Sequence, residues 1–203
     1  MKIKMIAITG DWKSEYYSSI CLDKWSELGY EVEWFEATTP STLGTELTFR
    51  ETKFNGNRFT EFEKAIWYSH FYMWKSITEP THIIEHDTYP LKKLPEFDGE
   101  VGMFSLFPRN NKAWLQGRTE ISPGSGYYIT KQVAEHLIAE SLKEEIFENV
   151  DGHIFRILNP YVYTGSLDRN LDADIAVNNY WCEQASCFQI VNYDIGTSAE
   201  HNV

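Results

Sequence analysis

The sequence predicts an α/β fold in which helices cover both faces of a mainly parallel sheet. Short stretches rich in β-branched and apolar residues alternate with longer segments whose apolar residues recur every three or four positions. This alternation is typical of successive strand-helix units. No linker, repeat or low-complexity segment interrupts it, and 203 residues suffice for one well-buried unit. We therefore predict a single domain over residues 1–203.

The amino-terminal part of the chain predicts a strand-helix-strand unit. Residues 3–9 are apolar and β-branched, as in a buried first strand. A helix is expected next, with Ser14 as its N-cap and Gly29 as its end. In residues 31–35 apolar side chains alternate with acidic ones, which is a strand pattern, and residues 38–48 have the Thr, Pro and Gly content of a loop.

The strongest helix pattern of the chain covers residues 59–78, where apolar residues form one continuous stripe. A short buried strand, residues 81–87, follows directly. The later predicted elements are a strand over 99–107, a polar loop over 110–125, a strand over 127–129 and a helix that Thr130 can cap.

Composition excludes several classes of protein. The net charge of -12 is unlike that of a protein whose main task is to grip nucleic acid. Three cysteines without a CxxC spacing argue against a disulfide framework or a structural zinc site. No apolar run approaches the ~20 residues of a membrane span. We expect a cytoplasmic protein without an anchor of its own.

Two carboxylates, Glu85 and Asp87, stand one residue apart where the strand over 81–87 ends. Residues i and i+2 of an extended chain point to the same side, so both can aim at one point at the carboxyl end of the strand. A hard divalent cation, Mn²⁺ or Mg²⁺, that also holds a diphosphate would relieve their repulsion. By the same alternation His86 should point away. The alternative is a strand that runs into a polar turn.

Four segments, in this order and spacing, resemble glycosyltransferase family 25, the lipopolysaccharide and procollagen galactosyltransferase type. They are Phe35-Glu36-Ala37, residues 63–70 with Glu63 in front and Ser69-His70 at the end, Ile83-Ile84-Glu85-His86-Asp87, and residues 126–137; Val150-Asp151 follows. The likeness covers residues 1–155 and leaves 156–203 as an unassigned extension of the same domain. It implies a GT-A type, Rossmann-like fold that binds a nucleoside diphosphate sugar.

This chain departs from the family at two places. The Arg-rich turn that the family has after the first strand is replaced by Gly10-Asp11-Trp12-Lys13, and His86 stands in place of the middle Asp of the acidic motif. The first departure leaves this turn without the arginines that the family offers to the donor diphosphate. The second lowers the local negative charge.

The resemblance also implies roles for individual residues. Asp87 and Glu85 would hold the metal, with His153 as a further candidate ligand, and Asp151 would join Asp87 as a catalytic residue by acting as the base. The simpler interpretations are a buried core histidine for His70 and a plain turn for Asp151. The residues expected to bind the donor are Thr9, Gly10, Glu63, Ser69, His70 and Glu85.

The first functional hypothesis is a metal-dependent glycosyltransferase. It would move a hexose from a nucleoside diphosphate sugar, UDP-linked, to an acceptor hydroxyl with inversion. A saccharide or lipid-linked glycan is the expected acceptor, and a modified nucleic acid is disfavoured by the net charge of -12. Two alternatives stay open: a non-catalytic sugar or nucleotide-binding module on a decayed glycosyltransferase fold, and a nucleotidyltransferase.

Overall fold

A computed structural model describes residues 1–44, 52–55, 58–94, 100–103, 105–106, 126–154, 156–157, 177–178 and 187–189. The predicted loop over 110–125 and most of the extension over 156–203 lie outside these residues. The centre of the described fold is a six-stranded sheet of order β2-β1-β3-β7-β5-β8. Its strands are β1 (Lys2–Ala7), β2 (Val32–Glu36), β3 (Thr81–Glu85), β5 (Val101–Met103), β7 (Gly126–Ile129) and β8 (Val177–Asn178).

The sheet is mainly parallel, as predicted. β1 pairs in parallel with both β2 and β3, and β5 pairs in parallel with β8. β7 lies between β3 and β5 and is antiparallel to each of them. Within the described sheet, β7 is therefore the strand that runs against the others.

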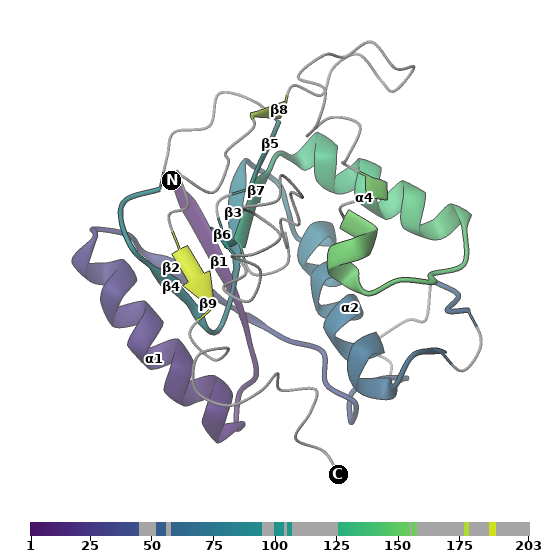
Figure 1. The fold of residues 1–203 in the computed structure, drawn as a ribbon, viewed down its shortest axis with the longest axis horizontal. Helices are drawn as coiled ribbons and strands as arrows, with labels where there is room; N and C mark the ends of the chain where they lie inside the picture. Colours follow the sequence, from purple (N-terminus) through teal and green to yellow (C-terminus); the bar gives the residue numbers. More distant parts are fainter. Residues whose placement is uncertain are drawn as a thin grey trace, which may run out of the picture.

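Helices cover both faces of this sheet, which confirms the predicted layering (Figure 1). α1 (Trp12–Glu27) packs on one face, while α2 (Glu61–Lys75) and α4 (Lys131–Lys143) pack on the other. Alternation along β1 divides the core accordingly. Ile3 and Met5 join the cluster under α1, and Ile6 joins the cluster under α2 and α4.

Side-chain caps define where the helices begin. The prediction that Ser14 caps α1 is wrong: the cap is Asp11, whose carboxylate accepts the Ser14 N–H at 2.8 Å. The buried Ser14 hydroxyl instead accepts the Ile8 N–H, which ties the start of the helix to the end of β1. The predicted cap of α4, Thr130, is confirmed.

β3 is shorter than predicted because the chain turns immediately after Glu85. The Glu85 N–H donates to the Thr88 hydroxyl at 3.0 Å, which closes a turn over residues 86 and 87. The chain then enters β4 (Thr88–Pro90), which belongs to a second, three-stranded sheet of order β4-β9-β6. Its other strands are β9 (Cys187–Gln189) and β6 (Ser105–Leu106), so the predicted strand over 99–107 is two short strands.

The strand order creates a switch point between β1 and β3. From β1 the chain moves by way of α1 to β2 on one side, and then by way of α2 to β3 on the other side of β1. Open α/β sheets bind their ligands outside the carboxyl ends of the strands at such a point. Across the described residues, no helix has the length and apolar character needed to span a membrane.

Candidate functional site

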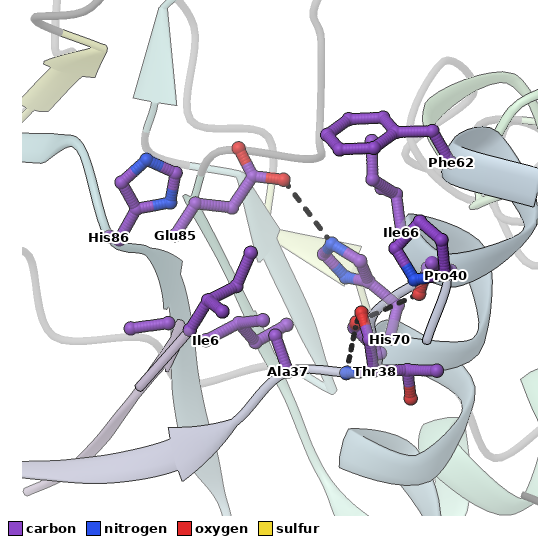
Figure 2. A pocket seen from close by; sticks show the side chains of 13 residues that line it. Ile6, Ala37, Thr38, Pro40, Phe62, Ile66, His70, Glu85 and His86 are labelled. Atoms are coloured by element: carbon purple, nitrogen blue, oxygen red, sulfur yellow. Dashed lines mark hydrogen bonds and ion pairs between the residues drawn. The ribbon is translucent and has the colours of Figure 1, made fainter. Parts of the chain in front are cut away.

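A pocket of about 150 Å³ opens at the carboxyl ends of β1 and β3, beside α2 (Figure 2). A cavity of about 150 Å³ can hold a ring the size of benzene, so this pocket fits one ring rather than a whole nucleotide. Its wall is mainly apolar, and the polar lining residues are Thr38, Ser69, His70, Glu85 and His86. The described lining residues are Ile6, Ala7, Ile8, Ala37, Thr38, Pro40, Phe62, Ala65, Ile66, Ser69, His70, Glu85 and His86.

Glu85 and His86 both line this pocket. Figure 2 shows their side chains next to each other, across the pocket from Phe62 and Ile66. The prediction that His86 points away from Glu85 is therefore wrong. Alternation holds only for an extended chain, and the turn after Glu85 ends the extended segment.

Asp87 lies in different surroundings from Glu85. Its side chain is buried and is not among the described residues that line the pocket. Burial raises the pKa of the Cys21 thiol, and the nearby negative charge of Asp87 raises it further. Because Cys21 belongs to the core under α1, Asp87 lies toward that face of the sheet. The predicted convergence of Glu85 and Asp87 on one point is thus not seen, and the metal and catalytic roles of Asp87 stay predictions.

His70 connects the pocket to the core through a chain of hydrogen bonds. Its Nδ1 lies 2.9 Å from the Tyr127 hydroxyl, and its Nε2 lies 3.4 Å from Oε1 of Glu85. The Tyr127 oxygen also accepts the indole N–H of Trp74 at 2.8 Å. The prediction that His70 reaches the same site as Glu85 is therefore consistent with the geometry, although the ring itself is buried.

Burial keeps His70 neutral at pH 7, and its electrostatic surroundings include the carboxylate of Asp151. Burial lowers the pKa of His70 to about 4, against an opposing effect of the negative charge of Asp151. The same two carboxylates, Glu85 and Asp151, also act on the buried Tyr127 hydroxyl. Asp151 is the second residue of the helical segment over 150–154 and is not among the described residues that line the pocket.

Ser69 shapes the pocket by holding the segment that follows β2. Its buried hydroxyl accepts the Thr38 N–H at 2.9 Å and donates to the Ala65 carbonyl one turn earlier in α2 at 2.8 Å. Thr38 and Ala65 both line the pocket. Ser69 therefore fixes one pocket wall against another.

Glu63 has a structural task that the sequence interpretation missed. It forms a capping box with Thr60: its carboxylate accepts the Thr60 N–H at 2.8 Å, and the Thr60 hydroxyl accepts the Glu63 N–H. Glu63 is not among the described residues that line the pocket. The spacing of threonine and glutamate just before an apolar run was the available signal.

Thr9 and Gly10 lie in the exposed turn after β1, where glutamate carboxylates already accept hydrogen bonds from their backbone N–H groups. The Thr9 N–H donates to Glu36 at 3.0 Å, and the Gly10 N–H donates to Glu15 at 2.8 Å. A diphosphate would have to displace these carboxylates to bind here. Gly10 has φ +80°, the left-handed conformation that favours glycine.

His153 is buried and is not among the described residues that line the pocket. Its Nε2 lies 2.8 Å from the Ser141 hydroxyl of α4, and its ring packs edge-on against Trp67. Burial, together with the positive charge of Arg156, lowers its pKa to about 4. The predicted metal set of Glu85, Asp87 and His153 is not assembled, and no group of three His, Cys, Asp or Glu side chains suited to a metal occurs among the described residues.

No family model matches this sequence, and no curated protein shows significant similarity to it. Solved structures are similar at low levels. The galactosyltransferase LgtC, in complex with donor and acceptor sugar analogues, gives a TM-score of 0.43 at 10% identity, over 93% of this chain and 86% of that one. A glycosyltransferase involved in glycosylation of the major capsid of PBCV-1 gives 0.42 at 13% identity, over 80% and 76%.

A nucleotidyltransferase shows a comparable similarity. The inositol-1-phosphate CTP transferase of T. maritima gives a TM-score of 0.40 at 13% identity, over 78% of this chain and 81% of that one. Similarities this low do not assign the chain to a family or an activity. The resemblance to glycosyltransferase family 25 is not confirmed by them.

Proposed function

We propose that the protein is a glycosyltransferase of GT-A type that moves a hexose from a UDP-linked sugar to an acceptor hydroxyl with inversion. One observation carries the proposal: a ring-sized pocket lies at the switch point of a mainly parallel sheet, with the Glu85 carboxylate at the end of β3 on its wall. The acidic motif of the sequence resemblance includes this same carboxylate.

The chemistry of the pocket wall suits the base of the donor. Aliphatic and aromatic side chains from β1, the segment after β2 and α2 form the two apolar sides, as a planar ring requires. Ser69 and His70 also line the pocket, but their polar atoms are held by Thr38 and Ala65 and by Tyr127 and Glu85, so they give the wall its shape. The sugar and diphosphate would then lie outside the pocket, past Glu85 and His86.

A diphosphate beside Glu85 requires a cation, because two anionic groups would otherwise repel each other. Glu85 and His86 offer one carboxylate and one imidazole on the same wall, and a donor diphosphate with water could complete the shell. Imidazole favours Mn²⁺ over the more strictly oxygen-seeking Mg²⁺. A bound ion would offset the charge that develops on the departing diphosphate.

The base and the acceptor are proposed from the chemistry that an inverting transfer requires. Transfer with inversion needs a carboxylate to take the proton of the acceptor hydroxyl, and Asp151 is the proposed base. Its negative charge acts on both His70 and Tyr127, the side chains behind the pocket, which supports this choice. A saccharide or a lipid-linked glycan remains the proposed acceptor.

A non-catalytic binding module is the second candidate. It is favoured by the occupied N–H groups of Thr9 and Gly10, and by the burial of Asp87 away from the pocket. Such a module would bind the base of a nucleotide in the pocket and would not break the glycosidic bond of a sugar nucleotide.

Release of UDP from a panel of UDP-hexoses, measured with and without Mn²⁺, separates these candidates. Metal-dependent release, even as slow hydrolysis without acceptor, is the expected result. UDP binding without turnover of any sugar nucleotide would establish the binding module instead. Release of pyrophosphate from a nucleoside triphosphate and a sugar phosphate would identify a nucleotidyltransferase.

A further inference from the structure

The hydrogen-bond chain behind the pocket has a direction that its donors impose. An indole N–H can only donate, so the Tyr127 oxygen accepts from Trp74 at 2.8 Å. The hydroxyl proton of the buried Tyr127 then needs an acceptor, and Nδ1 of His70 lies 2.9 Å away. An imidazole that accepts at Nδ1 carries its proton on Nε2, which faces Oε1 of Glu85 at 3.4 Å.

This hydrogen-bond chain leads from the core to the pocket. Trp74, Tyr127 and His70 are each 1% exposed or less, while the Glu85 side chain is 21% exposed and lines the pocket. Three different elements, α2, β7 and β3, contribute to it. Three buried side chains are thus ordered so that one N–H points at the carboxylate at the end of β3. Figure 2 shows the last of these contacts, between the His70 ring and the Glu85 carboxylate.

We propose that His70 is a positioning residue for the donor site: Trp74 and Tyr127 fix it as the Nε2–H tautomer, and that N–H holds the Glu85 carboxylate toward the pocket. The inference rests on the proposed function and deepens it. A carboxylate at a strand end has several rotamers, and one directed N–H selects among them. Outer partners of this kind orient the groups that touch a metal or diphosphate.

The geometry around His70 requires a neutral ring, because a doubly protonated imidazole has no nitrogen left to accept from the Tyr127 hydroxyl. The groups that face the ring are Glu85 from β3, Tyr127 from β7 and Asp151 from the helical segment over 150–154. The ring therefore donates through Nε2 and accepts through Nδ1, as the hydrogen-bond chain requires.

Tyr127→Phe is the sharpest variant, because it keeps the ring and removes the hydroxyl that fixes the tautomer. Tyr128→Phe is its matched control: the same change, one residue later, on the opposite face of β7. We expect ¹⁵N NMR of the His70 imidazole to show the Nε2–H tautomer in the wild type and in Tyr128→Phe, and a mixture of tautomers in Tyr127→Phe.

Titration with UDP in the presence of Mn²⁺ gives the second readout. Tyr127→Phe is expected to weaken binding by about 10- to 100-fold, the usual effect of losing an outer partner, while Tyr128→Phe binds like the wild type. His70→Gln, which still offers an N–H to Glu85, should bind more tightly than His70→Leu. A purely structural histidine would not give this rescue at equal thermal stability.

The outcomes separate the two proposals. Unchanged tautomer and unchanged UDP affinity in Tyr127→Phe would overturn the positioning role of His70. A wild type that shows the expected tautomer but binds no UDP would overturn the proposed donor site, and the role of Glu85 with it, while leaving the hydrogen-bond chain itself established.

Discussion

Glu85 is the residue on which the account depends most, because it joins the pocket to the buried hydrogen-bond chain. Its backbone ends β3, its N–H is held by Thr88, and its carboxylate faces both the pocket and His70. These contacts explain how one acidic side chain at a strand end can be held in a single orientation.

Glu85→Gln is the direct test at this scale, since it keeps the shape of the side chain and removes its charge. We expect metal-dependent UDP release to fall by about 100-fold or more, the usual effect of losing one preorganised electrostatic contributor. Glu79→Gln, at the opposite end of the sheet, is the matched control and should retain full activity. Equal activity of the two variants would rule out a role for Glu85 in the reaction.

Part of the site could be predicted from the sequence, residue by residue. Glu85, Ser69 and His70 were found because the motif and the helix stripe mark them. The orientation of His86 was missed, because alternation fails in a turn closed by a side-chain hydrogen bond. Tyr127 was missed because its partnership with His70 joins β7 to α2 across the core, which no local pattern encodes.

Helix α2 contributes more lining residues to the pocket than any other element, and its start is fixed by the capping box of Thr60 and Glu63. Sequence periodicity predicted this helix well, since the apolar stripe buried against the sheet sets its length. The residue at which the helix begins is set by the capping side chains, which the apolar periodicity does not reveal. β3 was predicted too long for the same reason: a turn partner, Thr88, ends it.

The capping box allows a test of the predicted donor role of Glu63. Glu63→Gln preserves the box, whereas Glu63→Ala removes it and should lower the free energy of unfolding by about 1 kcal/mol, measured by urea unfolding. We expect UDP affinity to be unchanged in the Gln variant. A Gln variant that is fully stable yet fails to bind UDP would instead establish Glu63 as a donor-binding residue.

At the scale of the whole molecule, three buried histidines make stability depend on pH. Burial lowers the pKa of His70, His82 and His153 to about 4 each. The unfolded chain takes up these protons near pH 6.5, before the folded protein does, so stability is complete above that pH and falls toward pH 4. Each histidine can account for about 3 kcal/mol over this range.

Urea unfolding at a series of pH values checks this expectation. The free energy of unfolding should fall by several kcal/mol between about pH 7.5 and pH 5. His153→Gln, which cannot titrate, should show a shallower fall than the wild type. A free energy of unfolding that stays constant over this range would mean that the three histidines are not buried as neutral rings.

The predicted layering and mainly parallel sheet hold for the whole described fold, because alternating strands and helices leave few other ways to cover both faces. The order of the strands was not predicted. It depends on contacts between distant segments, such as the insertion of antiparallel β7 beside β3. The position of the switch point, and with it the pocket, follows from that order.

The most direct test of the central claim is calorimetric titration of UDP, with Mn²⁺, into wild type and a variant with a filled pocket. Ala37→Phe places a ring into the pocket from the segment after β2, and Ala139→Phe makes the same change on the exposed side of α4. We predict that wild type and Ala139→Phe bind UDP and that Ala37→Phe, folded to the same extent, does not. Equal binding by Ala37→Phe and wild type would contradict the account.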